Sequence, residues 1–206
     1  MLNDEQWYAD NGITLHKGKW VEEVNRATRI VRASDGCEAG YDRLIIATGS
    51  SPFIIPIPGN ELDGVISFRD INDVDTMLLA SRKTGGKSVV IGGGLLGLEA
   101  ANGLLIQGMD VSVVHLMDTL MERQLDKPAA ALLKTSLEQK GMKFLMKAQT
   151  EAILGTDKAE GIRFKDGLEI PADLVVMAVG IRPNIDLARK IGLHCERGIV
   201  VNDTMQ

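Results

Sequence analysis

Short apolar runs alternate with longer amphipathic stretches through the middle of the chain. Residues 88–91 and 111–115 have the length and composition of buried strands, and residues 95–107 between them have the length of a helix. Two parallel strands joined by a helix form a right-handed crossover unit. This alternation predicts an α/β fold with a Rossmann-like parallel sheet.

Two more helices are indicated on either side of this unit. Residues 67–81 carry apolar positions at helical spacing, with Asp70 or Asn72 as a candidate N-cap. Asp126 is the candidate N-cap of a later helix, which leads into a strand over residues 142–146. These elements extend the predicted parallel sheet.

After this region the pattern changes to short strands joined by polar turns. Residues 149–154, 161–165 and 168–171 predict an antiparallel β-meander inserted before a last apolar strand over residues 173–179. Residues 198–201 are a further possible strand. Near the N-terminus, residues 7–45 also indicate short strands. Those expected strands cover residues 14–16, 21–24, 29–31, 37–39 and 41–47.

A proline-rich segment interrupts these patterns. Pro52, Pro56 and Pro58, followed by Gly59, exclude a helix or a central strand. A domain boundary is predicted there, and a long surface loop within one domain is the alternative. The predicted organisation is residues 1–58, residues 59–183 and residues 184–206.

The loop between the two central strands carries a dinucleotide fingerprint. Gly92 allows a tight turn, Gly94 lets the backbone approach a pyrophosphate, and Gly97 lets the helix pack closely on the strand. Leu95 and Leu96 begin the helix, whose free N–H groups would bind the phosphates. A preceding strand and a following helix favour dinucleotide binding. A glycine-rich turn without a ligand is the alternative.

Two titratable residues near the fingerprint, His115 and Glu99, are candidate contacts of the dinucleotide. His115 ends the second strand, where an Asp or Glu that binds the ribose is expected about 20 residues on. Histidine can hydrogen-bond a ribose hydroxyl or, when protonated, meet a 2′-phosphate; an ordinary exposed strand-end residue is the alternative. Glu99 is either an acid that the positive end of the helix dipole stabilises, or a residue that helps to orient the nicotinamide end or the flavin-side groups. The choice between NADH and NADPH stays open.

Composition and charge narrow the function classes. The net charge is −5 with no long basic stretch, which argues against a nucleic-acid partner. No apolar run is long enough to span a bilayer, and the polar start of the chain predicts a cytoplasmic protein. Cys37 and Cys195 stand apart and indicate neither a metal site nor a redox disulfide. No catalytic residue is assigned, because no nucleophile–base pair is visible.

Three segments together resemble the pyridine nucleotide-disulfide oxidoreductase type of flavoprotein reductase, which has tandem FAD and NAD domains. They cover residues 47–52, 92–101 and 178–184. Residues 115–126 are similar to the large subunit of assimilatory NAD(P)H nitrite reductases. A rubredoxin or ferredoxin reductase is the alternative within the family. The resemblance implies hydride transfer from NAD(P)H to FAD, feeding the reduction of nitrite to ammonia.

The resemblance also implies which residues meet each cofactor. Val179 and Gly180 would line the nicotinamide pocket, and Ala47, Thr48 and Gly49 would approach FAD. Residues 1–58 would be a partial FAD-binding domain, residues 59–183 the NAD(P)-binding domain and residues 184–206 a truncated return segment.

Other parts of the intact protein are expected beyond these residues. The resemblance implies a separate FAD fingerprint, a later flavin motif, and a C-terminal reductase module with an iron–sulfur cluster and sirohaem that this chain does not bind. We expect the fragment to be inactive alone and residues 1–58 to self-associate or be disordered, since they lack partner strands. A stand-alone nucleotide-binding module and a ligand-free scaffold are further alternatives.

Overall fold

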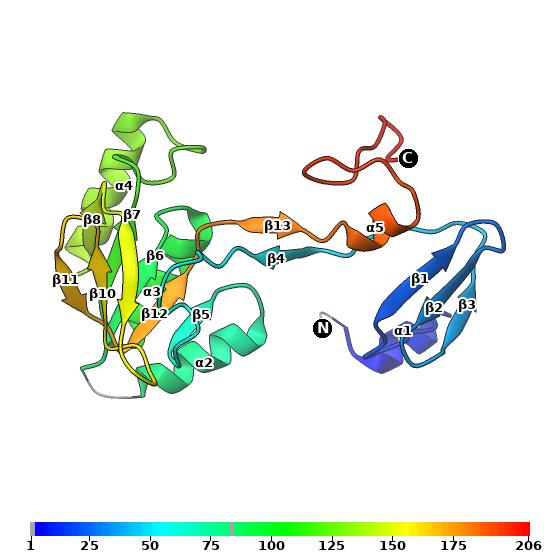
Figure 1. The fold of residues 1–206 in the computed structure, drawn as a ribbon, viewed down its shortest axis with the longest axis horizontal. Helices are drawn as coiled ribbons and strands as arrows, with labels where there is room; N and C mark the ends of the chain where they lie inside the picture. Colours follow the sequence, from blue (N-terminus) through cyan, green and yellow to red (C-terminus); the bar gives the residue numbers. More distant parts are fainter. Residues whose placement is uncertain (1–2, 83–84) are drawn as a thin grey trace. The chain divides into compact units, whose positions relative to one another are not determined.

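The computed structural model describes residues 3–82 and 85–206 and divides the chain into two compact units (Figure 1). Unit 1 comprises Met1–Ser50 and Pro183–Gln206, and unit 2 comprises Ser51–Arg182. Met1 and Leu2, at the start of the predicted FAD segment, lie outside the described residues. Each unit has its own sheet and its own set of packed side chains.

Unit 2 is built on a five-stranded parallel sheet with the order β5-β12-β6-β7-β8. Its strands are β5 (Val65–Ser67), β6 (Lys87–Ile91), β7 (Asp110–His115), β8 (Lys143–Met146) and β12 (Leu174–Met177). The predicted α/β fold with a parallel sheet is confirmed. In this order β6 pairs with β7 on one side and with β12 on the other. The strand order reverses beside β6, so the topological switch point of the sheet lies there.

Three helices connect these strands: α2 (Ile71–Ser81), α3 (Leu95–Ile106) and α4 (Lys127–Gln139). Asp70 caps α2 in a capping box with Asp73, and Asp126 caps α4 by accepting from the Ala129 N–H at 2.9 Å. Because capping satisfies free N–H groups of the first turn, these side chains set where the helices begin.

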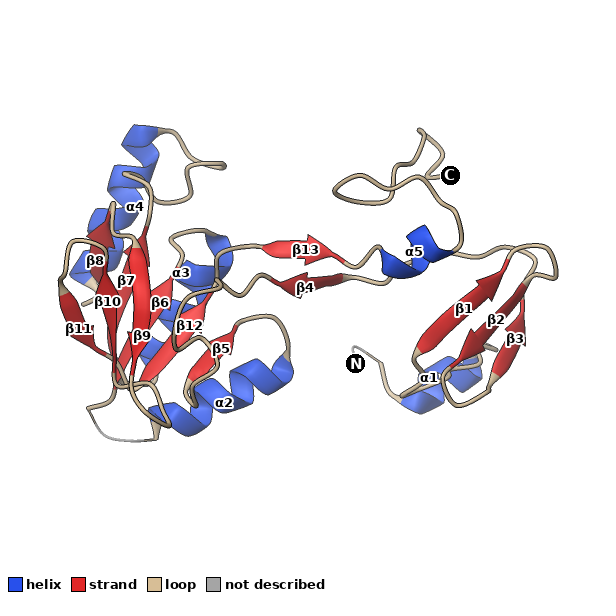
Figure 2. Ribbon diagram, viewed as in Figure 1, coloured by secondary structure: helices blue, strands red, loops and turns tan. Residues whose placement is uncertain are grey.

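The predicted meander is also confirmed. It consists of β9 (Thr150–Leu154), β10 (Gly161–Phe164) and β11 (Glu169–Pro171), which form an antiparallel sheet with β10 in the centre (Figure 2). The meander lies between β8 and β12 in the sequence.

Both faces of the parallel sheet are covered, because successive side chains of each strand point to opposite faces. Val90, Val113 and Val176 belong to a core cluster with side chains of α2, α3 and α4. Val89 and Val175 belong to a second cluster, which includes Ile162 and Phe164 of the meander. The sheet is therefore enclosed by helices on one face and by the meander on the other.

Unit 1 is smaller and more open. It contains α1 (Glu5–Asp10), a three-stranded antiparallel sheet of β1 (Val21–Asn25), β2 (Ile30–Ala33) and β3 (Glu38–Gly40), and α5 (Asp186–Lys190). Lys190 Nζ donates to the Glu22 carbonyl oxygen at 2.8 Å, and Arg26 Nη1 donates to that of Ile191 at 3.3 Å. These bonds join the C-terminal residues to the sheet.

Several expected strands of unit 1 do not form. Residues 14–16, 41–47 and 198–201 contain no strand. Ile45, in the apolar run at 41–47, is 88% exposed. An apolar run becomes a strand only where a neighbouring segment pairs with it through backbone hydrogen bonds. Among the described residues, no segment pairs with residues 41–47 in this way. The expectation of strands from residue 7 onward also missed α1, whose N-cap Asp4 accepts from the Trp7 N–H at 2.8 Å.

Two details of unit 2 differ from expectation. The helix expected from residue 67 begins at Ile71, because residues 65–67 form the short parallel strand β5 and Asp70 caps the helix. The unit division falls after Ser50, whereas the expected boundary followed Pro58. Ile55 and Ile57 pack against the cluster on the meander side, and the Ile153 N–H donates to the Pro58 carbonyl oxygen at 2.9 Å. Residues 53–58 therefore pack within unit 2.

The segments that cross between the two units form strands of their own. β4 (Ser50–Pro52) and β13 (Ile181–Pro183) make a two-stranded sheet that the sequence patterns did not predict. Among the described helices, none combines the length and the apolar character that a bilayer crossing requires.

Candidate dinucleotide-binding site

The fingerprint loop joins β6 to α3 at the carboxyl edge of the parallel sheet. Gly92 has φ +126°, and a Cβ there would lie 2.3 Å from the Ala178 carbonyl oxygen. A Cβ on Gly97 would lie 1.9 Å from the carbonyl oxygen of Gly92. Real Cβ atoms do not approach oxygen this closely, so both positions require glycine. These two residues bring strand, loop and helix into close contact.

Gly94 differs from these two glycines because the space beside it is open. Nothing lies within 4 Å of a Cβ built there. Gly94 is the N-cap of α3 and makes no side-chain capping bond, and the N–H groups of Gly94, Leu95 and Leu96 have no acceptor among the described residues. An open approach to free helix N-terminal N–H groups fits a phosphate group.

The segment after β12 lies next to this loop. The Ala178 N–H donates to the Ile91 carbonyl oxygen at 2.9 Å, which extends the pairing of the two strands. Val179 is half-buried, and the exposed Gly180 has φ +121° and accepts from the Phe53 N–H at 2.9 Å. The structure therefore places Val179 and Gly180 at the same edge of the sheet as the fingerprint.

His115, the last residue of β7, packs against the glycine loop. Only 9% of the residue is exposed, so the alternative of an exposed strand-end residue is wrong. Its Nδ1 accepts from the Gly93 N–H at 3.1 Å, and its Nε2 lies 3.2 Å from Glu122 Oε2. Neither Gly93 nor Glu122 was predicted as a site residue, because only the fold brings them to His115.

Glu99 lies on α3 with its side chain exposed, and no hydrogen bond or ion pair of that side chain is recorded within residues 3–82 and 85–206. Its carboxylate is one turn from the open N-terminus of the helix. The structure leaves it available to a ligand, and its role toward the nicotinamide stays a prediction.

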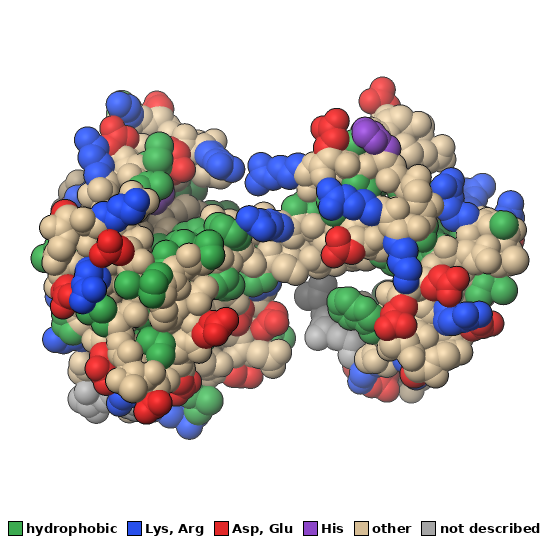
Figure 3. All heavy atoms as spheres, viewed as in Figure 1, with side chains coloured by type: hydrophobic (Ala, Val, Ile, Leu, Met, Phe, Trp, Pro, Cys, Tyr) green, Lys and Arg blue, Asp and Glu red, His purple; other side chains and the backbone are tan. Residues whose placement is uncertain are grey.

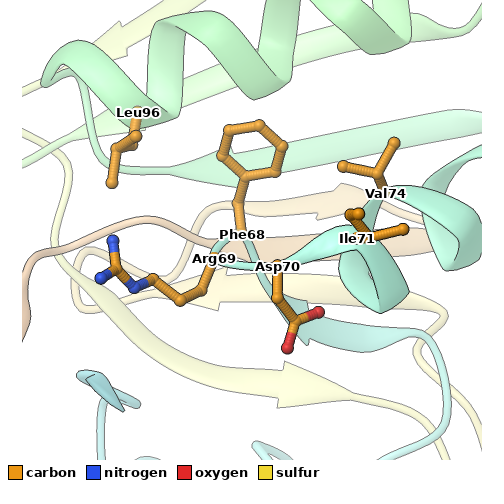
Figure 4. A pocket seen from close by; sticks show the side chains of 6 residues that line it. All are labelled: Phe68, Arg69, Asp70, Ile71, Val74 and Leu96. Carbon is orange, nitrogen blue, oxygen red and sulfur yellow. The ribbon is translucent and has the colours of Figure 1, made fainter. Parts of the chain in front are cut away.

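A pocket of about 230 Å³ opens between the start of α2 and the start of α3 (Figure 4). Its lining residues are Phe68, Arg69, Asp70, Ile71, Val74 and Leu96. In Figure 4 the Arg69 guanidinium points toward Leu96, at the first turn of the fingerprint helix. Arg69 was not predicted to line a pocket, since a single arginine before a helix cap carries no signal of its own.

The residues expected near FAD lie in unit 1. Ala47, Thr48 and Gly49 are exposed, and Gly49 has φ +68°. Thr48 Oγ1 donates to the Asn184 carbonyl oxygen at 2.5 Å, and Asn184 Nδ2 donates to the Thr48 carbonyl oxygen at 2.9 Å. The structure thus brings the Thr-Gly turn together with the end of the third resembling segment.

Metal ligands do not gather in the part of the chain that the structure describes, where no three His, Cys, Asp or Glu side chains are placed to hold an ion. Cys37 and Cys195 are free thiols.

The parallel sheet and the glycine loop at its switch point define the class of dinucleotide-binding α/β proteins. The family model for pyridine nucleotide-disulphide oxidoreductases matches residues 5–206. The chain therefore belongs to the pyridine nucleotide-disulphide oxidoreductase family, and the resemblance drawn from its motifs is confirmed.

Individual relatives agree with this assignment. A nitrite reductase [NAD(P)H] of Bacillus subtilis is 57% identical over 205 residues, which cover all of this chain and 25% of that protein. Rhodocoxin reductase of Rhodococcus erythropolis is 34% identical over all of this chain and 48% of its own length. A crystal structure of a ferredoxin reductase from Rhodopseudomonas palustris has a TM-score of 0.92 at 27% identity, covering 98% of this chain and 50% of that one.

The chain thus spans about a quarter of the length of the nitrite reductase and about half of the length of rhodocoxin reductase and of the ferredoxin reductase. All three relatives are reductases, one of them acting with NAD(P)H, and the family consists of oxidoreductases.

Proposed function

We propose that this chain binds NAD(P)H at the loop of residues 92–97 and forms part of a reductase that passes hydride from NAD(P)H to FAD. One observation carries the proposal. The fingerprint glycines divide into two positions that exclude any side chain, Gly92 and Gly97, and one position with open space, Gly94. Packing explains the first two, and the approach of a ligand explains the third.

In this proposal the chain's own groups hold and orient the dinucleotide. The free N–H groups of Gly94, Leu95 and Leu96 bind the pyrophosphate, and Val179 and Gly180 line the nicotinamide end. Glu99 orients that end. When bound, the nicotinamide ring supplies the hydride, and the protein supplies position and electrostatics.

On the FAD side, Ala47, Thr48 and Gly49 are the proposed contacts. The hydrogen bonds between Thr48 and Asn184 fix the course of this turn. The open backbone at Gly49, where nothing lies within 4 Å of a Cβ, supports an approach of the flavin cofactor. Most of the FAD site would come from segments other than this chain.

The specific reaction that we propose for the whole protein is the reduction of nitrite to ammonia. The 57% identity to a nitrite reductase [NAD(P)H] supports this assignment. The iron–sulfur cluster and sirohaem that such a reaction requires would be held by further segments. A ferredoxin or rubredoxin reductase is the second candidate, favoured by the TM-score of 0.92 to a ferredoxin reductase and by the rhodocoxin reductase match.

A fluorescence titration of the full chain with NADH and with NADPH tests the nucleotide site. We expect saturable binding of at least one nucleotide. The Gly94→Val variant keeps the fold, since Gly94 has φ −85° and open space beside it, but its side chain fills the space of the pyrophosphate. It should therefore lose binding. Gly103→Ala, on the same helix and also in open space, is the matched control and should bind normally.

Two results would contradict the nucleotide site: no binding of either nucleotide, or unchanged binding by Gly94→Val. The reaction is tested separately on the whole protein by supplying NADH with nitrite or with a ferredoxin-type acceptor. Nitrite-dependent NADH oxidation supports the first candidate, and acceptor reduction without nitrite turnover supports the second.

A further inference from the structure

In the usual fingerprint the second strand ends in an acid that binds the ribose. In this protein it ends in His115, and both nitrogens of the imidazole ring already have partners. Nδ1 of His115 accepts from the Gly93 N–H at 3.1 Å, and its Nε2 is 3.2 Å from Glu122 Oε2. The side chain is only 11% exposed. Neither ring nitrogen is free to bind a ribose hydroxyl or a 2′-phosphate.

The partners of His115 determine where its proton lies. A backbone N–H only donates, so Nδ1 must offer its lone pair to Gly93. The ring proton then lies on Nε2 and is donated to the Glu122 carboxylate. His115 is therefore a neutral positioning residue in this arrangement, and the charge at this strand end belongs to Glu122.

Glu122 is fixed to the glycine loop by two routes. One runs through the His115 ring to the N–H of Gly93. The other runs through the backbone, because the Met121 N–H donates to the Gly93 carbonyl oxygen at 3.0 Å. The Gly93 carbonyl oxygen is thus bonded directly to the segment that carries Glu122, and the Gly93 N–H is bonded to His115, which contacts Glu122. A Cβ on Gly93 would lie 2.8 Å from the His115 ring and 2.7 Å from Leu120, so this contact also requires glycine.

Glu122 keeps an accessible carboxylate in this position. Its side chain is 34% exposed, and only one of its oxygens has a recorded partner among the described residues. The nearby charged groups are Asp118, which pairs with Lys127 at 3.8 Å, and the exposed Arg123.

We propose that Glu122, positioned by His115, is the residue that selects NADH over NADPH at this site. The inference rests on the proposed nucleotide site. In the usual fingerprint an acid at the end of the second strand accepts hydrogen bonds from the ribose hydroxyls. Here the carboxylate reaches the same strand end from the following loop. It accepts from a ribose 2′-hydroxyl and repels a 2′-phosphate.

Titrations of the full chain with NADH and with NADPH test this inference. We expect the wild type to bind NADH about tenfold more tightly than NADPH, a ratio equivalent to ~1.4 kcal/mol. Glu122→Gln removes the charge and keeps the side-chain size, so it should bring the two affinities to within about twofold. Arg123→Gln, at the adjacent exposed position, is the matched control and should keep the wild-type preference.

Three results overturn the inference, and they are distinguishable. An unchanged affinity ratio in Glu122→Gln means that Glu122 does not select the cofactor. A wild-type preference for NADPH that Arg123→Gln abolishes assigns selection to Arg123. Failure of the wild type to bind either nucleotide overturns the proposed nucleotide site itself.

A second measurement needs no variant. The ¹⁵N chemical shifts of the His115 ring in the wild-type chain should show a neutral imidazole that is protonated on Nε2. A proton on Nδ1 would contradict the bond from Gly93 and with it the positioning of Glu122.

Discussion

The two units of this chain are stabilised in different ways. In unit 2 a parallel sheet is covered on both faces, and its central strands are almost completely buried. In unit 1 the buried apolar side chains are limited to a few small or medium residues in the part of the chain that the structure describes: Val24, Ala33, Ile185 and Ala188.

Exposed apolar side chains sharpen this contrast. Trp20 in unit 1 is 75% exposed, and Ile45 is 88% exposed. Hydrophobic side chains are visible on the surfaces of both units in Figure 3. Burial of apolar area is the main stabilising contribution to folding. Unit 2 therefore carries the stability needed for a rigid binding loop, whereas unit 1 has only a small apolar core. The self-association or disorder expected for residues 1–58 stays a prediction.

The largest expected effect comes from the glycine that packs the fingerprint helix. Gly97→Ala places a Cβ 1.9 Å from the Gly92 carbonyl oxygen, so strand and helix must separate. We expect unit 2 to lose about 3 kcal/mol or more of unfolding free energy. Gly103→Ala, in the same helix with open space, should instead stabilise it by up to ~1 kcal/mol. Urea unfolding followed by circular dichroism measures both.

A Gly97→Ala variant as stable as the wild type would show that the helix is free to move away from β6. The difference between the units would then be much smaller than the buried cores indicate.

The elements around the fingerprint could be predicted from the sequence. The glycine spacing, the flanking apolar runs and the Asp126 cap predicted β6, α3, β7 and α4, because each of these signals is local. The meander was predicted for the same reason, since its strands are separated by polar turns.

What the sequence could not provide depends on partners distant in the chain. The strand β5 has three residues and is defined by its pairing with β12, more than a hundred positions later. The run at 41–47 looked like a strand but lacks a neighbour to pair with. At the site, the contact between His115 and Glu122 arises from the course of the loop after β7, which has no periodicity that a local pattern can capture.

A matched pair of valine substitutions tests the comparison more directly. Val113 in the sheet of unit 2 is 0% exposed, and Val24 in the sheet of unit 1 is 6% exposed. We expect Val113→Ala to lower the free energy of unfolding by about 2–3 kcal/mol, because the lost methyl groups leave a cavity in a close-packed core. Val24→Ala should lower the free energy of unfolding by ~1 kcal/mol or less, since unit 1 buries few other apolar side chains that could line a cavity.

The two tryptophans, Trp7 and Trp20, both lie in unit 1. Tryptophan fluorescence therefore reports the unfolding of unit 1, whereas circular dichroism is dominated by the helices of unit 2. Equal costs for the two valine substitutions, or a single transition that both probes share in every variant, would contradict the proposed difference in stability.

The smallest expected effect concerns the surface ion pairs of unit 1. Lys19 donates a hydrogen bond to Asp35 and lowers the pKa of that carboxyl from its ordinary value of 3.8, and Asp35 in turn raises the pKa of Lys19. A lowered folded-state pKa contributes stability above pH 3.8, and this contribution is lost as the pH falls through the lower folded value. Because both groups are exposed, the contribution is small and screened by salt.

Lys19→Gln should therefore leave the tryptophan-monitored midpoint of urea unfolding nearly unchanged at pH 7. It should also flatten the decline of that midpoint below pH 3.8, since Asp35 then has no partner to lose. High salt should reduce the difference between variant and wild type. If Lys19→Gln instead lowers the midpoint as much as Val24→Ala does, ion pairs would rank with apolar burial in unit 1. Its difference from unit 2 would then lie in the kind of interaction, and not only in the size of the core.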